Sequence, residues 1–333
     1  MSEWEPELEE LKFRESLAEK MGGSEKVERQ NERGKLNIRE RIALLLDEDS
    51  FHEIGKIAGK ATYDENGDLL DLQASNFIFG RGRIDDRTVV IAGDDFTVRG
   101  GAADASIITK QVAAEQMANE LNLPIIRLID GTGGGGSVKT LDPNEHSKGS
   151  ISANTYGRGA RTYVPLNPGW EYVISNLATV PTVSLCLGPV AGLGAARAVS
   201  SHYSVMVKDL SQLFVAGPPV VNALGIEEVD KESLGGSQIQ TRNGSIDDEV
   251  ESEEEAFAAA RKFLSYLPSS TFENSEKLST EDSTSRTDPN LNDIIPRDRR
   301  KVYRMRNIIE SVFDVHSFFE MSSSFGRSAI TGL

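Results

Sequence analysis

Cysteine is nearly absent from this chain of 333 residues, and histidine is scarce. The single Cys186 lies in the apolar run TVSLCLG, so it supports neither a disulfide framework nor a zinc cluster. A buried small hydrophobe is its expected role, and a reactive thiol is the less favoured alternative. The four histidines, His52, His146, His202 and His316, have no metal-ligand spacing. The sequence therefore predicts no metal site, and it fits a reducing compartment.

The chain also lacks long apolar runs and a surplus of basic residues. No stretch approaches the ~18 consecutive apolar residues of a membrane span. The net charge of −16 argues against binding nucleic acid or an anionic membrane. An anionic ligand would have to be held locally, by glycine-rich backbone or a few Lys and Arg side chains. The acidic N-terminus predicts an amphipathic helix with Trp4, Leu8, Leu11 and Leu17, and neither a signal nor a transit peptide, so we expect a cytosolic protein.

What the chain does have is a regular alternation of strand and helix patterns between residues 75 and 265. Residues 75–98 predict a β-hairpin, because two runs rich in β-branched residues flank a polar turn at Asp85-Asp86. The short apolar runs PIIRLI and PTVSLCLG predict buried strands, and the run DASIITKQVAAEQMANEL predicts a helix. This alternation indicates an α/β domain. Residues 268–290 are rich in Ser and Thr and predict a linker.

An internal repeat links the two ends of the chain. The segment RERIALLLDEDSFHEIG begins at Arg39 and RNIIESVFDVHSFFEMS begins at Arg306, an offset of 306 − 39 = 267. At that offset six pairs are identical: Arg39/Arg306, Ile42/Ile309, Asp47/Asp314, Ser50/Ser317, Phe51/Phe318 and Glu53/Glu320. The repeat predicts that a second domain like the first begins near residue 291, with chance agreement over a short window as the alternative.

The segment IIRLIDGTGGGGSVKT, residues 125–140, looks like a phosphate-binding loop with altered spacing. Gly131 and Gly136 have the spacing of a P-loop, but Ser137 and Val138 displace Lys139 by two residues, and no apolar helix follows. A nucleotide P-loop is therefore disfavoured. We favour a loop at a strand end whose backbone N–H groups face a ligand, because glycines have no Cβ atoms to block it. A flexible loop without a ligand remains the alternative. The candidate binding residues of the segment are Asp130, Gly133, Gly134, Gly135 and Gly136.

Two further strands end in glycine-rich turns. One turn contains Gly100 and Gly101, and the other contains Gly188, Gly192 and Gly194 before the helical run GAARAV. Backbone N–H groups exposed at helix starts stabilise an anionic oxygen such as that of a thioester enolate. Tight turns that only pack helix on strand are the alternative for each taken alone. No G-x-S-x-G elbow and no clear acid–base pair is present, so the sequence favours backbone oxyanion chemistry.

In these stretches the chain resembles the carboxyltransferase (β) subunits of biotin-dependent acyl-CoA carboxylases, of the propionyl-CoA and methylcrotonyl-CoA type. The resemblance is carried in family order by GKLNIRERIALLLDEDSFHEIG, GRGRIDDRTVVIAGDDFTVRGGAA, PIIRLIDGTGGGG, VPTVSLCLGPVAGLGAA, FVAGPPVVNALGIEEVDKESLGGSQ and IIPRDRRKVYRMRNIIESVFDVHSFFE. It implies a crotonase-like α/β fold of stacked ββα units, with one complete domain and the first elements of a second.

The resemblance also implies a reaction and its site. A carboxybiotin, carried on a partner, releases CO2, and the enolate of an acyl-CoA such as propionyl-CoA or 3-methylcrotonyl-CoA attacks it. The family's oxyanion N–H groups correspond here to Gly192 and Leu193, with a shift to Gly194 and Ala195 as an alternative, and a partner N–H lies near Gly100 and Gly101. Gly188 and the 130–136 loop line the substrate site. The loop is longer than the family's and lacks its Arg.

The resemblance divides the chain into four parts: a helical extension over residues 1–33, an acyl-CoA carboxyltransferase domain over 34–267, a polar linker over 268–290 and the start of a C-terminal carboxyltransferase domain over 291–333. It implies partners, namely a biotin carboxylase or biotin carrier subunit and further copies of this chain, and it adds the mitochondrial matrix as a second location. We expect a ligase subunit that binds acyl-CoA but does not carboxylate it alone. A truncated non-catalytic acyl-CoA-binding paralogue and a crotonase-type acyl-CoA decarboxylase or hydratase are the alternatives.

Overall fold

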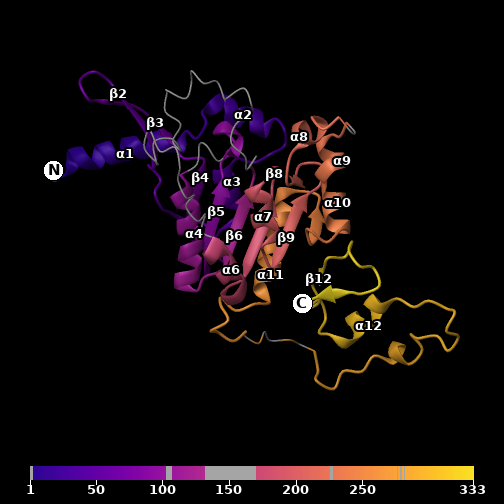
Figure 1. Cartoon of the computed structure of the whole chain (residues 1–333). Coiled ribbons are helices and arrows are strands. Elements are labelled where there is room, and N and C mark those ends of the chain that lie inside the picture. The colour runs from indigo at the N-terminus through magenta and orange to yellow at the C-terminus, as the bar shows by residue number, and fades with distance from the viewer. Residues whose placement is uncertain are drawn as a thin grey trace.

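A single seven-stranded sheet forms the centre of the molecule, with strand order β1-β4-β5-β6-β7-β9-β11 (Figure 1). The computed structural model describes residues 3–102, 107–131, 170–225, 228–275, 277, 280 and 282–333, so the predicted glycines Gly133, Gly134, Gly135 and Gly136 lie outside the described residues. The strands of this sheet are β1 (His52–Glu53), β4 (Phe77–Ile84), β5 (Arg87–Asp94), β6 (Ile125–Ile129), β7 (Thr182–Cys186), β9 (Tyr203–Val207) and β11 (Asp248–Val250).

The sheet combines an antiparallel hairpin with a parallel half. β4 and β5 pair antiparallel through Asp85 and Asp86, whose φ angles of 50° and 64° suit a tight hairpin turn. From β5 to β11 each neighbouring pair is parallel. Strands β6, β7 and β9 are buried along their whole length, as strands covered on both faces must be. The predicted hairpin and α/β alternation are confirmed, and the carboxyl ends of the parallel strands meet at one edge.

Helices cover both faces of the sheet. On one face α3 (Ile38–Leu45) and α11 (Glu253–Ser265) pack on the largest apolar cluster, and on the other α4 (Ile108–Leu121) and α7 (Leu193–Val199) cover β4 to β7, with α6 (Trp170–Thr179) beside α4. A capping box between Asn37 and Glu40 starts α3, and the Ser252 side chain caps α11. These caps fix where each helix begins at the site described below.

The remaining elements surround this core. They are α1 (Glu5–Glu19), α2 (Ser24–Asn31), β2 (Gly59–Tyr63), β3 (Leu69–Ala74), the 3-10 turn Arg99–Gly101, β8 (Pro189–Ala191), β10 (Gln212–Phe214), α8 (Pro218–Asn222), α9 (Lys231–Gly235), α10 (Ser237–Arg242), the 3-10 turn Pro289–Asn292, α12 (Met305–Val312), β12 (Glu320–Met321) and β13 (Thr331–Gly332). In the described part of the chain, none of the helices has the length and apolar character needed to cross a bilayer.

The N-terminal helix lies where the sequence predicts it, but it buries only one end. Leu17 and Ala18 pack on Leu72 of the β2–β3 hairpin, and α1 extends from the body of the molecule together with that hairpin (Figure 1). Trp4 and Leu8, which make the sequence pattern amphipathic, remain 69% and 46% exposed. Their pattern therefore predicts the helix and not its packing.

The repeat in the sequence is also a repeat of structure. Helices α3 and α12 are both eight residues long and lie 267 positions apart, and the second residue of each is an arginine that pairs with a glutamate fourteen residues later. In the first copy Arg39 donates to Glu53 at 2.9 Å, and in the second Arg306 donates to Glu320 at 2.6 Å. The first helix packs its apolar face on the sheet, whereas Val312 of the second is 62% exposed. The predicted domain boundaries themselves stay predictions.

Candidate functional site

The turn at Gly100 and Gly101 and the segment leading to Gly192 both contact the end of β6, at Asp130 and Gly131. These contacts lie at the carboxyl edge of the sheet. In the turn after β5, Gly100 and Gly101 have φ angles of 64° and 66°. A Cβ on Gly101 would lie 2.6 Å from the carbonyl oxygen of Asp130, so only glycine lets this turn approach the end of β6. The next carbonyl, that of Gly131, accepts a hydrogen bond from the Ala191 N–H at 3.3 Å. Residues 29 positions apart (Gly101 and Asp130) and 60 positions apart (Gly131 and Ala191) therefore meet at this edge.

The third turn ends at the start of α7. Gly192 has φ 62° and ψ −125°, and its N–H donates to the carbonyls of Phe214 and Val215 at 3.3 and 3.1 Å. The first helical hydrogen bond runs from the Ala196 N–H to the Gly192 carbonyl at 3.1 Å. The N–H groups of Leu193, Gly194 and Ala195 precede it, so they have no acceptor within the helix. The open donors thus begin one residue after Gly192.

The predicted partner N–H groups are engaged locally. The Gly100 N–H donates to the Phe96 carbonyl at 3.0 Å, and the Gly101 N–H donates to the Val98 carbonyl at 3.2 Å. Both bonds close the tight turn that places Gly101 against Asp130. In this structure these two glycines shape the site through their backbone conformation, and their N–H groups close the turn.

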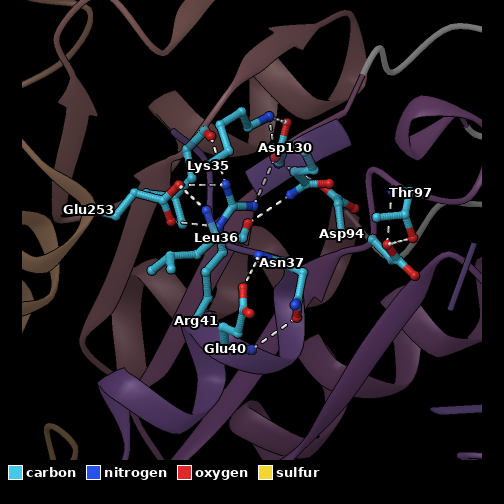
Figure 2. A network of polar contacts seen from close by, with 12 residues as sticks. Lys35, Leu36, Asn37, Glu40, Arg41, Asp94, Thr97, Asp130 and Glu253 are labelled. Carbon is cyan, nitrogen blue, oxygen red and sulfur yellow. Dashed lines mark hydrogen bonds and ion pairs between the residues drawn. The ribbon is translucent and has the colours of Figure 1, made fainter. Parts of the chain in front are cut away.

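A buried ion cluster supports the surface from below (Figure 2). Arg41 on α3 is fully buried and donates to Asp130 at 2.8 Å, to Glu253 at 2.6 Å and to the Leu187 carbonyl at 2.9 Å. It thereby joins the ends of β6 and β7 to the start of α11. The predicted binding residue Asp130 is also fully buried and faces this cluster, so its carboxylate positions the loop that follows rather than facing solvent.

Lys35, which is also buried, extends the same cluster toward Phe96. Its ammonium lies 2.6 Å from Asp130 and 4.3 Å from the ring centre of Phe96, and burial lowers the pKa of this amine. A Cβ on Gly188 would collide with the Asp130 carboxylate and lie 2.5 Å from the Lys35 nitrogen. The predicted residue Gly188 is therefore a glycine because the ion pair occupies the space of a side chain.

A cleft of about 490 Å³ opens beside these turns, and Lys35, Phe96, Gly100 and Pro189 form part of its wall. Six cationic side chains line it: Lys26, Arg29, Arg33, Lys35, Arg99 and Lys231. Asp209 is the one carboxylate among the described lining residues. In a chain of net charge −16 this is a local reversal of sign, which favours an anionic ligand such as a phosphate ester.

Comparison with known proteins decides the family. Residues 29–333 match the family model described as the carboxyl transferase domain. The chain belongs to the carboxyl transferase domain family. The resemblance seen in the sequence motifs is therefore confirmed.

Relatives of this carboxyl transferase domain include longer chains with named activities. It is 31% identical to the propionyl-CoA carboxylase beta chain of Roseobacter denitrificans, over 98% of this chain and 60% of the relative. It is 28% identical to the methylmalonyl-CoA decarboxylase subunit alpha of Veillonella parvula, over 93% of this chain and 57% of the relative. The transcarboxylase 12S structure, described as a hexamer with methylmalonyl-coenzyme A bound, matches all of this chain and 61% of its own, with TM-score 0.82 and 27% identity. The crotonase-like α/β fold is thus confirmed, and the chain spans about 60% of the length of these relatives.

The carboxyl transferase domain also contains a carboxyl group that the sequence patterns did not single out. Asp94 is the last residue of β5, and its Oδ2 accepts a hydrogen bond from the Asp130 N–H at 3.2 Å (Figure 2). Its side chain is half-buried, and burial raises its pKa to about 6. The signal that could have found it is an acidic residue at the end of a strand, six positions before Gly100.

A second buried network holds α7 in place. Arg127 on β6 pairs with Glu115 of α4 at 2.8 Å and donates to the Ser200 carbonyl, just after α7, at 2.7 Å. The same Glu115 pairs with Arg197 at 3.3 Å. Burial opposes ionisation of Glu115, but the nearby guanidinium groups hold its pKa below the ordinary value. This network holds the C-terminal end of α7, and the hydrogen bonds of the Gly192 N–H hold its start.

Cys186 takes no part in this surface. The thiol is fully buried at the end of β7, as the sequence predicted for a small hydrophobe, and burial raises its pKa to about 12. At neutral pH it is therefore a neutral packing group.

Proposed function

We propose that this chain binds an acyl-CoA and stabilises its thioester enolate, as the acyl-CoA-binding part of a biotin-dependent carboxyltransferase. The observation that carries the proposal is the basic cleft whose wall includes Pro189, the first residue of the strand β8 that leads to α7. A CoA thioester has phosphates at one end and a reactive carbonyl at the other. In this proposal the cleft supplies positive charge for the phosphates, and the N–H groups of the first turn of α7 supply donors for the carbonyl oxygen.

In this proposal the phosphates of CoA lie among the cationic side chains of the cleft, near Lys26 and Arg29 of α2. The thioester oxygen lies at the first turn of α7, where the N–H groups of Leu193 and Gly194 donate to it. Gly192 has its N–H engaged, so we place the donor pair one residue later than the family motif implies. Preorganised donors of this kind stabilise an enolate oxygen more than the neutral carbonyl.

Carboxybiotin on a partner would supply the CO2 and the base for the α-proton. Among the described residues, the segment 317–325 packs near Tyr203 and Asp247, at the amino ends of β9 and β11 and so at the opposite end of the sheet from the glycine turns. This arrangement supports our proposal that a second subunit provides the biotin-binding half. The residues of this chain hold and orient the acyl-CoA and stabilise negative charge on its oxygen.

The repeated geometry of α3 and α12 supports a second proposal about organisation: residues 291–333 begin a domain built like the first. In the first copy the β1 strand pairs with β4 through Glu53 and Gly80, and in the second β12 pairs with β13 through Glu320 and Gly332. A Cβ on either glycine would meet the carbonyl just before the paired glutamate, that of His52 or Phe319. The two strand pairs are therefore equivalent.

Calorimetry with propionyl-CoA and 3-methylcrotonyl-CoA tests acyl-CoA binding, with free CoA as the matched ligand without an acyl group. We expect heat of binding with at least one thioester, and the absence of heat with both would refute the proposal. We further expect no carboxyl transfer from carboxybiotin by this chain alone, so measurable transfer would refute the assignment of the biotin half to a second subunit. Binding that never leads to transfer, even with a biotin-bearing partner, would support the non-catalytic alternative.

A further inference from the structure

Two buried glutamines line the basic cleft, and the amide oxygen of each lacks a hydrogen-bond partner. Gln30 on α2 and Gln212 on β10 are both 5% exposed. In the described part of the chain, five buried side-chain atoms have no hydrogen-bond partner, and the Oε1 atoms of these two residues are among them. Native proteins pair nearly all buried polar atoms, so two unpaired acceptors in the wall of one cleft require an explanation.

The contacts of the amide nitrogens establish how each amide group is oriented. The Gln30 Nε2 donates to the Leu36 carbonyl at 2.7 Å, and the Gln212 Nε2 donates to the Glu232 carboxylate. Because a carbonyl and a carboxylate only accept, the amide end that contacts them must be the nitrogen. The other end is an oxygen, and the partner that it lacks is therefore an N–H or O–H donor.

The two unpaired oxygens belong to different parts of the cleft. Gln30 lies on α2, the helix that supplies cations proposed to hold the phosphates. Gln212 pairs with Pro189 across the parallel strands β8 and β10. Two residues further along β10, the Phe214 carbonyl accepts from the Gly192 N–H at 3.3 Å. At ~3.3 Å per residue, β10 spans the ~7 Å between the cleft wall and the start of α7.

We propose that these two oxygens recognise CoA along its length, Gln30 at the nucleotide and Gln212 at the pantetheine arm. The adenosine of CoA carries hydroxyl and amino donors, and the pantetheine arm carries secondary amide N–H groups between the phosphates and the sulfur. In the cleft these donors leave water and need acceptors in the protein. The Gln30 oxygen accepts from the adenosine. The Gln212 oxygen accepts from a pantetheine N–H and so aligns the arm along β10 toward α7.

Binding in this proposal includes a small shift of the cleft wall. Both oxygens are covered in this structure, so the two amide groups move toward the ligand when it enters. Changes of side-chain conformation of this kind are common when a complex forms. The inference rests on the proposed function, because it assigns two further contacts to the same ligand.

Calorimetry of the full chain tests the two contacts with two ligands, propionyl-CoA and adenosine 3′,5′-bisphosphate, which is part of the CoA nucleotide without the arm. Gln212→Met removes the acceptor at similar side-chain size, and we expect the Kd of propionyl-CoA to rise about tenfold. The Kd of adenosine 3′,5′-bisphosphate should stay at the wild-type value, which also shows that the variant is folded. Gln30→Met should raise both Kd values.

Gln240→Met is the matched control outside the cleft lining. The Gln240 amide donates to the Leu213 carbonyl at 2.7 Å and accepts from the Asn243 side chain at 3.1 Å, so its oxygen already has a partner. The variant loses an amide group of the same kind, and we expect it to bind both ligands with the wild-type Kd.

The outcomes separate this inference from the proposed function. If the wild-type chain binds propionyl-CoA and a glutamine variant binds it equally tightly, the role of that glutamine is wrong while acyl-CoA binding stands. If Gln212→Met weakens both ligands to the same extent, the assignment of Gln212 to the pantetheine arm is refuted. If the wild-type chain binds neither ligand, the proposed function fails, and both contacts fail with it.

Discussion

Arg41 donates to the backbone carbonyl of Leu187 at 2.9 Å, although 146 residues separate them. The bond ties a helix near the N-terminus to the end of β7, where the turn leading to α7 begins. The same guanidinium pairs with Asp130 at the end of β6 and with Glu253 at the start of α11. One side chain thus holds two of the strand ends from which the site is built, and four elements share its position.

Replacing Arg41 with Met should strongly destabilise the fold. The change leaves the Asp130 and Glu253 carboxylates buried with fewer partners, which costs about 3–5 kcal/mol for a buried pair. Urea denaturation followed by circular dichroism measures the free energy of unfolding. The matched control is Arg29→Met, because the exposed pair of Arg29 with Glu25 should contribute less than ~1 kcal/mol. Equal effects of the two variants would contradict this account of the cluster.

Gly188→Ala should disturb the site through a single methyl group. The new Cβ collides with Asp130 and approaches Lys35, so we expect a loss of about 1–3 kcal/mol in stability and weaker binding of propionyl-CoA. Gly217→Ala is the control, because the nearest atom to its Cβ position is 3.6 Å away and its φ is −71°. Thermal unfolding and calorimetry of both variants check the prediction, which fails if Gly188→Ala behaves like the control.

Neutralising the cleft should weaken binding of CoA thioesters. The double variant Lys26→Gln, Arg29→Gln removes two cations from one wall, and we expect at least a tenfold rise in Kd, which corresponds to ~1.4 kcal/mol. The salt dependence of Kd should fall as well, since fewer charges are screened. Lys12→Gln, Lys60→Gln provides the same change of charge outside the cleft lining. A Kd that shifts equally in both double variants would mean that only net charge matters.

Cys186 should resist alkylation in the native protein. Its thiol is fully buried and its pKa is raised to about 12, so almost no thiolate is present at pH 7 or 8. Titration with a chromogenic disulfide reagent should therefore show no reaction until urea unfolds the chain, and one equivalent afterwards. Rapid native labelling would show that β7 opens far more readily than its burial indicates.

Titration of Asp94 should make the free energy of unfolding depend on pH. Its pKa is raised to about 6 in the folded state, so the folded protein holds a proton that the unfolded chain releases near pH 4. Its contribution is present at low pH and lost as pH rises from about 4 to 6, by roughly 3 kcal/mol, since one pKa unit corresponds to about 1.36 kcal/mol. Asp94→Asn should remove this loss, so its stability relative to wild type improves between pH 4 and 7. A difference between the two proteins that stays constant with pH would contradict the raised pKa.

Many secondary-structure elements of this protein can be predicted from the sequence, because the patterns that specify them are local. The hairpin at Asp85-Asp86, the buried strands PIIRLI and TVSLC and the polar cap of α3 each follow from residues close together in the chain. The two described glycine turns, at Gly100 and at Gly192, follow from local sequence for the same reason. The repeat at Arg39 and Arg306 required only a comparison of the chain with itself, and the structure repeats the ion pair that follows each arginine.

Contacts between distant segments decide which polar groups at those turns already have hydrogen-bond or ion-pair partners. Asp130, selected as a binding residue, is held by Lys35 and Arg41, and the Gly192 N–H is held by the carbonyls of Phe214 and Val215 at the end of β10. Asp94 is brought level with Ile129 only by the parallel register of β5 and β6. Sequence patterns report which residues are apolar, small or charged along one element. The partners of a backbone N–H or a buried carboxylate are set when the sheet brings separate strand ends to one edge.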